Sequence, residues 1–133
     1  MAFIEIRYGK SRFVILAWRY AIKFPRVNNP NSALPICGRL RQGLRCNLME
    51  AKAWQENKYA NLCPIVFAQK HGLFLVMPRA RPMSNEEFDE WHDSDDWPYV
   101  RDDDPPFEAK SADAGILPDG RYVMIDYGAD GFE

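Results

Sequence analysis

Two short sets of residues in this 133-residue chain have the types and spacing needed to bind a phosphate and a metal ion. Ala21 and Lys23 stand two positions apart in a β-type stretch, so their side chains project to the same side. The small alanine leaves room for a flat base, and the lysine can reach phosphate oxygens. Asp126 ends a second apolar stretch beside a flexible glycine, where its carboxylate can reach Mg²⁺ on a phosphate.

Both sets resemble motifs of the protein-kinase family. Ala21-Ile22-Lys23 is similar to the Ala-x-Lys of the third kinase strand, and Asp126-Tyr127-Gly128 is similar to the metal-binding Asp-Phe-Gly, with Tyr in place of Phe. The resemblance implies that Glu50, on the next predicted helix, pairs with Lys23 and holds it in place. It assigns Ala21, Lys23 and Glu50 to nucleotide binding. The alternatives are a surface lysine, a helix-capping glutamate and a turn aspartate.

A third set of residues matches the spacing of the kinase catalytic loop. Kinases carry a catalytic Asp, a Lys two residues later and an Asn five residues after the Asp. Glu108, Lys110 and Asp113 stand at these spacings. The resemblance therefore implies catalytic positions for Glu108 and Lys110, and metal-binding positions for Asp113 and Asp126, with ATP and Mg²⁺ as cofactors. The alternative is an ordinary charged surface loop.

Several departures from the kinase pattern indicate impaired catalysis. The phosphate-covering loop of kinases is rich in glycine, whereas Tyr8–Ser11 offers only Gly9. Only 29 residues separate Pro78 from Glu108 and five follow Gly128, too few for a helical lobe and an activation segment. We therefore expect a kinase-like binding or regulatory protein that acts through another protein, similar to small kinase-like proteins of phages and prophages. A small active phosphotransferase that uses Mg²⁺ and ATP is the alternative.

The charges of the chain are divided between its two parts. Residues 1–80 hold 13 Lys and Arg against 3 Asp and Glu, whereas residues 81–133 hold 4 against 16, so the balances are +10 and −12. We expect a single domain, 1–133, in which the acidic segment 86–104 lies near the basic, N-lobe-like part. Alternatively, the acidic surface imitates nucleic acid and inhibits a nucleic-acid-binding host or defence complex. Direct contact of the basic part with nucleic acid stays open.

The pattern of apolar residues predicts a mainly antiparallel sheet with one main helix, an α+β fold similar to the kinase N-lobe with a C-terminal β-hairpin. A first strand is expected at Phe3–Tyr8, and a long β-rich run at Arg12–Phe24. Within that run Tyr20, Ile22 and Phe24 share one side, which is expected to face the core. Turn residues divide four further segments into two hairpins: Cys63–Gln69 with Leu73–Met77, and Gly115–Leu117 with Arg121–Ile125.

Two helices are expected between these strands. The main one lies within Gly38–Asn57, where Asn47 and Glu50 resemble a capping box that would delay the regular helix to the residue after Asn47. A second capping-box pattern, Ser84-Asn85-Glu86-Glu87, opens a short helix with an apolar inward side.

The sequence shows no membrane span, secretory signal or zinc site. Its longest apolar runs, Phe13–Trp18 and Leu73–Met77, fall far short of the ~20 residues that cross a bilayer. The first residues lack a basic segment followed by an apolar one, so a cytoplasmic location is expected. Cys37, Cys46 and Cys63 are too widely spaced for a zinc site and are expected to be free, buried thiols.

Overall fold

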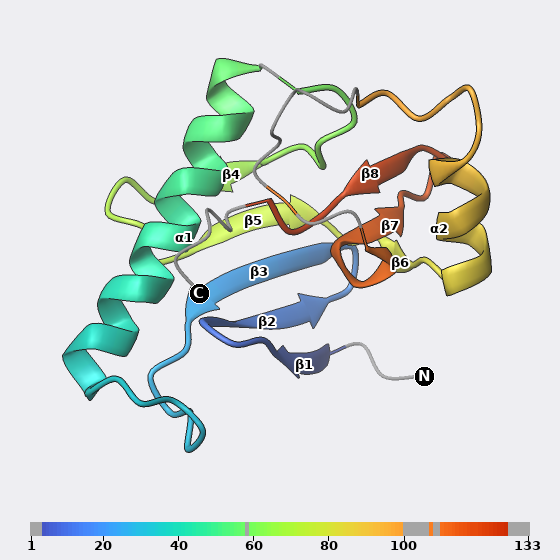
Figure 1. The fold of residues 1–133 in the computed structure, drawn as a ribbon. Helices are drawn as coiled ribbons and strands as arrows, with labels where there is room; N and C mark the ends of the chain where they lie inside the picture. The colour runs from blue at the N-terminus through green and yellow to red at the C-terminus, as the bar shows by residue number, and fades with distance from the viewer. Residues whose placement is uncertain (1–3, 58, 100–106, 108–109, 128–133) are drawn as a thin grey trace.

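The computed structural model describes residues 4–57, 59–99, 107 and 110–127 (Figure 1). The elements in these ranges follow in this order: β1 (Ile4–Tyr8), β2 (Arg12–Ala17), β3 (Tyr20–Pro25), α1 (Ile36–Glu56), β4 (Phe67–Ala68), β5 (Leu75–Pro78), β6 (Arg81–Pro82), α2 (Asn85–His92), a 3₁₀ turn (Ser111–Asp113), β7 (Ala114–Ile116) and β8 (Tyr122–Met124).

The strands form two antiparallel sheets. The larger sheet has five strands in the order β1-β2-β3-β5-β4, and the smaller has three in the order β6-β7-β8. The main helix α1 lies along one face of the larger sheet, while α2 lies beside the smaller sheet at the other end of the molecule (Figure 1). The predicted α+β fold, a mainly antiparallel sheet with one main helix and a closing hairpin, is confirmed.

The start of α1 differs from the sequence expectation. The helix begins at Ile36, directly after Pro35, so Asn47 and Glu50 lie in its interior and the predicted capping box there is wrong. Both side chains are buried and bind other segments instead of the helix end. Gly43 allows α1 to approach the end of β3, because a Cβ at that position would lie 2.5 Å from Pro25.

The capping box predicted for α2 is confirmed. Ser84 Oγ accepts a hydrogen bond from Glu87 N at 3.1 Å, and Ser84 N donates to Glu87 Oε1 at 3.0 Å. Phe88 and Trp91 then pack inward, whereas His92 is exposed. The two predicted hairpins are also present, as β4 with β5 and as β7 with β8.

The β-rich run from Arg12 is two strands instead of one. A turn at Trp18 and Arg19 separates β2 from β3, and Trp18 has a φ of 55°, in the left-handed region. The Arg19 guanidinium carbon lies 4.0 Å from the centre of the Trp18 ring. The sequence did not predict this turn, because the run contains no Gly, Asn or Pro, which are the residues that usually mark turns.

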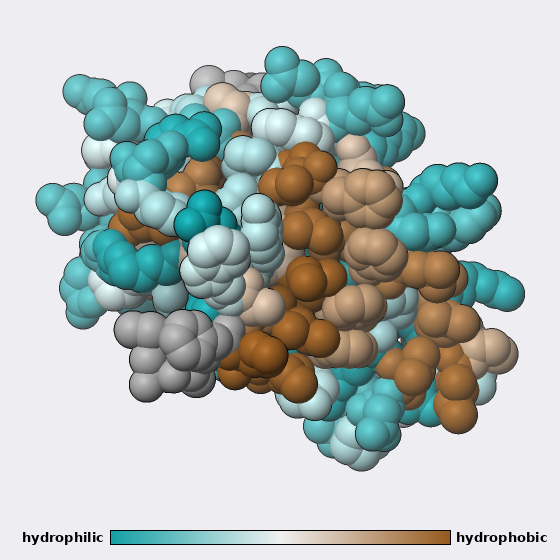
Figure 2. All heavy atoms as spheres, turned by 180° about the vertical axis from the view of Figure 1, so that it is seen from behind, coloured by the Kyte–Doolittle hydropathy of each residue, from teal (hydrophilic) through white to brown (hydrophobic). Residues whose placement is uncertain are grey.

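One face of the five-stranded sheet is apolar and open to solvent (Figure 2). Tyr20, Ile22 and Phe24 lie on this face, half-buried or exposed, so the prediction that they face the core is wrong. The helix α1 packs against the opposite face, which carries Ala21 and Lys23, and therefore buries that set instead.

The main core lies between β5 of the larger sheet, the smaller sheet, α2 and the end of α1. Its most deeply buried members include Cys63, Leu75, Met77, Met124 and Tyr127. Cys46 and Cys63 are buried free thiols, as predicted, and Cys37 is free but exposed. Within the described ranges, neither helix has the length and apolar character needed to span a membrane.

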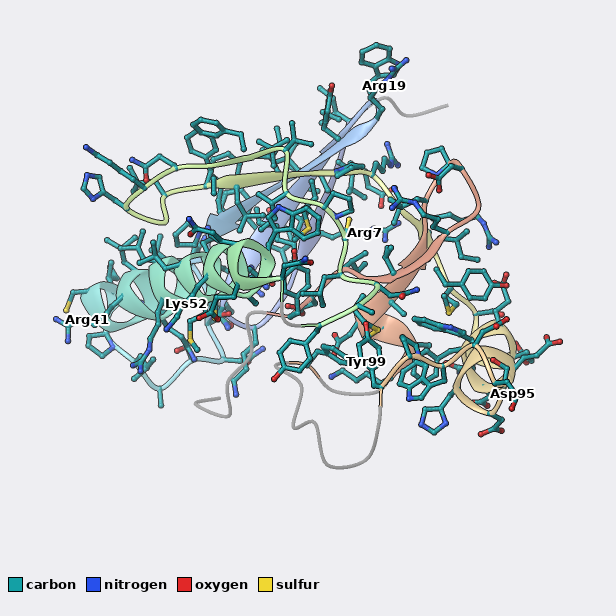
Figure 3. The ribbon with its side chains drawn as sticks, turned by 90° about the horizontal axis from the view of Figure 1, so that it is seen from above. Arg7, Arg19, Arg41, Lys52, Asp95 and Tyr99 are labelled. Atoms are coloured by element: carbon teal, nitrogen blue, oxygen red, sulfur yellow. The ribbon has the colours of Figure 1, made fainter. Side chains whose placement is uncertain are left out.

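The described part of the acidic segment consists of most of α2 and the residues that follow it. Asp95 is at that end of the molecule, whereas Arg41 and Lys52 lie along α1 (Figure 3). Glu87 pairs with Arg81 at 3.0 Å, within the second half of the chain. Because residues 100–106 lie outside the described residues, the approach of the acidic segment to the basic part stays a prediction.

Candidate functional site

Lys23 and Glu50 form a buried ion pair between β3 and α1. Lys23 Nζ donates to Glu50 Oε1 at 2.8 Å, and the two residues are 6% and 0% exposed. Strand alternation places Lys23 on the same side as Ala21. Helix spacing places Glu50 on the side of α1 that also carries Gly43 and Asn47. The structure thus brings together the two residues that the kinase resemblance pairs.

Arg12, which the sequence did not single out, joins this pair from β2. Its Nη2 donates to Glu50 Oε2 and to Asp126 Oδ1, both at 2.5 Å, and its Nη1 donates to Asn47 Oδ1 at 3.1 Å. Arg12 is 7% exposed. Each carboxylate oxygen of Glu50 therefore faces a different cation, while Asp126 already has a guanidinium on one of its oxygens.

One sequence signal could have revealed Arg12. In β2, Arg12, Val14 and Leu16 share a side, since strand side chains alternate. A single arginine among apolar residues on an inward side needs a buried acidic partner. Asn47 had no such signal, because its role is to join segments: its Nδ2 donates to the carbonyls of Lys23 at 3.2 Å and Gly72 at 2.9 Å.

Backbone hydrogen bonds hold Asp126 at the edge of this cluster. The preceding residue, Ile125, donates its N–H to the Asp113 carbonyl at 2.7 Å and accepts a hydrogen bond from Lys23 Nζ. The following residue, Tyr127, donates its N–H to Glu50 Oε2 at 3.2 Å. The Tyr127 hydroxyl donates to the Cys63 carbonyl at 2.7 Å, deep in the core. Asp126 is thus fixed from both sides.

The charges of the cluster reinforce one another. Burial alone would raise the pKa of Glu50, but the positive charges of Arg12 and Lys23 outweigh it and lower the pKa from its ordinary 4.5 to about 2. Burial likewise opposes the charge on Arg12, yet the carboxylates of Glu50 and Asp126 raise its pKa. Glu50 and Arg12 are therefore both ionised at neutral pH.

A cleft of about 580 Å³ opens beside the cluster. Its apolar end is formed by strand residues of the larger sheet and its polar end by the charged cluster and the β1–β2 turn. Members of its lining include Gly9, Lys10, Arg12, Val14, Leu16, Ala21, Lys23, Met77, Lys110, Asp113, Ile125 and Asp126. An apolar slot that ends in cations and carboxylates suits a nucleoside phosphate.

The structure places most of the predicted site residues in this cleft. Ala21, Lys23, Lys110, Asp113 and Asp126 line it. Glu50 lies behind Lys23, fully buried. Glu108, the predicted catalytic residue, lies outside the described residues. Their functional roles stay predictions.

Comparison with solved structures identifies the architecture. The chain superposes on the crystal structure of WbdD with a TM-score of 0.56 at 12% identity, over 97% of this chain and 33% of that chain. The complex of WbdD with the kinase inhibitor LY294002 gives 0.55 at 13% identity, with the same two coverages. A third structure, of the bifunctional kinase-methyltransferase WbdD, gives 0.50 at 13% identity, over 90% and 30%. This chain has a kinase-like fold.

The match is limited to the fold and to part of WbdD. The chain spans about a third of the length of these structures, 33% in the first two. No protein-family model matches the chain, and no curated protein does. Within the kinase-like fold, the Lys23–Glu50 pair joins a strand to the main helix, as the resemblance implied.

The described residues do not provide a ready metal site. No group of three or more His, Cys, Asp or Glu side chains in the described ranges could hold a metal ion. Asp126, the carboxylate that the kinase resemblance assigns to Mg²⁺, has one oxygen bound to Arg12. Mg²⁺ would therefore have to share this carboxylate with the guanidinium of Arg12, whose positive charge opposes a second cation there.

Proposed function

We propose that this chain is a nucleotide-binding, kinase-like protein with impaired phosphoryl transfer, which acts by binding another protein. The observation that carries the proposal is that Lys23 and Asp126 line one cleft whose opposite end is apolar, with Glu50 buried behind Lys23. Lys23 is held at the cleft by Glu50, and Ala21 leaves space at the strand surface for a base.

Impaired transfer is supported by the position of Arg12. Phosphoryl transfer needs phosphates, metal and acceptor to be positioned together. The guanidinium of Arg12 holds the carboxylate that would bind the metal ion. The β1–β2 turn, which lines the phosphate end, contributes a single glycine. An active phosphotransferase, an acidic inhibitor of a nucleic-acid-binding complex and an origin in a phage or prophage stay predictions from the sequence.

Thermal melting tests nucleotide binding. ATP at about 100 times its dissociation constant should add ~2.7 kcal/mol to the free energy of unfolding and raise the melting temperature by roughly 10 °C. Lys23→Met should reduce this ATP-induced rise by at least half, because it removes a phosphate-facing cation. Lys52→Met, which removes an exposed lysine of α1, is the matched control and should keep the full rise. No rise with ATP, ADP or GTP would refute nucleotide binding.

The same purified protein can be tested for phosphoryl transfer. Incubation with γ-labelled ATP and Mg²⁺ or Mn²⁺ should leave peptides and the protein itself unlabelled. Label that disappears in Asp126→Ala would instead show an active phosphotransferase. That outcome would leave nucleotide binding in place and overturn only the impaired part of the proposal.

Binding of another protein is supported by the open apolar face of the larger sheet (Figure 2). Five aromatic rings cross it in a row, with neighbouring centroids 5.2–6.2 Å apart: Tyr8, Phe13, Phe24, Phe74 and Phe67. Arg26 lies over the Tyr8 ring at 4.9 Å, and Lys70 follows Phe67 in the next turn. A continuous apolar face between cations suits a polypeptide with an apolar surface bordered by carboxylates.

Two designed peptides test this face. One is an amphipathic helix of about 20 residues with leucines on one side and glutamates on the other, and the second has lysines in place of the glutamates. The glutamate peptide should bind at least roughly tenfold more tightly, and salt should weaken it. Fluorescence anisotropy of the labelled peptides measures both.

Matched variants locate the peptide. Phe67 is 53% exposed on the open face, so Phe67→Ser should weaken binding of the glutamate peptide. Leu48 is an exposed apolar residue of α1, so Leu48→Ser should not. Equal binding of both peptides contradicts the proposed partner chemistry. A dimer in sedimentation experiments that Phe67→Ser abolishes would assign the face to a second copy of the chain.

A further inference from the structure

We propose that Arg12 takes the place of a divalent cation in the cleft, so that a nucleoside triphosphate binds here without metal. The inference rests on the proposed nucleotide binding and specifies how the phosphates are neutralised. It starts from a disagreement between the kinase-like fold, whose Asp-Phe-Gly carboxylate binds metal, and the contacts of Asp126 in this chain.

The ion pair of Arg12 with Asp126 differs from an ordinary surface pair because Arg12 is buried and has further partners. It is 7% exposed, and the same guanidinium also binds Glu50 and Asn47. A metal ion at Asp126 would have to displace, or bind beside, a cation that three side chains hold. If both stayed, three positive charges would lie within a few ångströms of one carboxylate, which strongly disfavours the ion.

The charge balance of the cluster points the same way. Arg12 and Lys23 carry two positive charges, and Glu50 and Asp126 carry two negative charges. The cluster is therefore neutral without a metal ion. The remaining cations of the cleft, Arg7, Lys10 and Lys110, outnumber its other carboxylate, Asp113, and leave the cleft positive toward phosphates.

A planar guanidinium is also suited to this task. Arginine presents donors in a fixed fork, so one edge can hold carboxylates while another faces phosphate oxygens. Arg12 lines the cleft next to the β1–β2 turn, at the polar end where phosphates are expected. It acts as a binding and positioning residue that neutralises phosphate charge, while Lys23 supplies the second contact.

Titration of the full chain with the fluorescent analogue mant-ATP tests the inference. The dissociation constants measured in EDTA and in excess MgCl₂ should agree within about twofold for the wild-type protein. Without nucleotide, titration with Mn²⁺ followed by electron paramagnetic resonance should show no site of micromolar affinity. Neither measurement depends on a variant that has to fold.

Variants of Arg12 provide the second arm. Arg12→Leu removes a charge-assisted hydrogen bond and frees Asp126, so binding in EDTA should weaken by roughly tenfold or more, and Mg²⁺ should then restore it. Arg12→Lys should lie between the wild type and Arg12→Leu. Arg41→Leu, which removes an exposed arginine of α1, is the control and should bind as the wild type does.

The outcomes separate the inference from the proposed function. Wild-type binding that is at least tenfold tighter in MgCl₂ than in EDTA overturns the inference and leaves nucleotide binding intact. Binding in neither buffer overturns both. Binding in EDTA that Arg12→Leu leaves unchanged, with circular dichroism showing a folded variant, also overturns the role of Arg12.

Discussion

Glu50→Gln should lower the free energy of unfolding by about 3–5 kcal/mol, the cost of removing one partner from a buried ion pair. The carboxylate of Glu50 is fully buried between Arg12 and Lys23, at 2.5 and 2.8 Å. Glutamine keeps the shape of the side chain but leaves both cations without their shared counter-charge. Because single domains have only about 5–15 kcal/mol of stability, the variant should be close to unfolding. Urea denaturation measures the loss.

The pH dependence of stability provides an independent check of the same residue. The pKa of Glu50 is about 2 in the folded protein against an ordinary 4.5. A carboxyl group with a lowered folded pKa stabilises the fold above its unfolded pKa, and the contribution is lost as the pH falls toward the folded one. About 3 kcal/mol should therefore disappear between pH 4.5 and pH 2 in the wild type.

A matched substitution on the same helix is the control. Glu56→Gln removes an exposed carboxylate at the end of α1 and should change stability by no more than about 0.5 kcal/mol. Glu50→Gln should also lack the wild-type loss of stability between pH 4.5 and pH 2 that Glu50 contributes. A cost below about 1 kcal/mol would mean that Glu50 does not hold Arg12 and Lys23 in solution.

Local sequence patterns predicted part of this cluster. Ala21 and Lys23 share a side because strands alternate, and Asp126 stands where a strand ends, so both placements follow from short stretches of chain. The sequence allowed two interpretations of Glu50, as a helix cap or as the partner of Lys23. The helix begins far upstream of Asn47, which leaves Glu50 in the interior where it meets Lys23. Local sequence allowed both the helix cap and the ion pair, and the tertiary contact between β3 and α1 determines which of the two forms.

Other features could not be predicted from local patterns. Arg12 and Asp126 are 114 positions apart, and their contact depends on how β2 and the segment after β8 both meet α1. The strand β3 offers an apolar side and a mixed side, and period-two alternation does not say which side a helix covers. Here α1 covers the side with the lysine, because Glu50 and Asn47 satisfy Lys23 and the adjoining backbone there.

Tyr127→Ala should lower the free energy of unfolding by about 3–5 kcal/mol, as truncation of large buried aromatic residues does. Tyr127 stands where the kinase motif that this segment resembles has Phe, and its ring is fully buried in the main core. Its hydroxyl donates to the Cys63 carbonyl at 2.7 Å, and burial raises the pKa of this phenol, which therefore stays a donor across the physiological range. The alanine variant loses both the ring packing and this hydrogen bond.

Two further substitutions separate these contributions. Tyr127→Phe keeps the ring and should cost about 1–2 kcal/mol, because it leaves the Cys63 carbonyl without its phenol donor. Tyr8→Ala removes an exposed tyrosine of β1 and should cost less than about 1 kcal/mol. Loss of the buried ring loosens the segment whose backbone N–H at residue 127 binds Glu50 beside Asp126, so the alanine variant that still folds should bind mant-ATP more weakly than Tyr127→Phe does. Equal stability of the alanine variant and the wild type would contradict the burial of Tyr127 in the core.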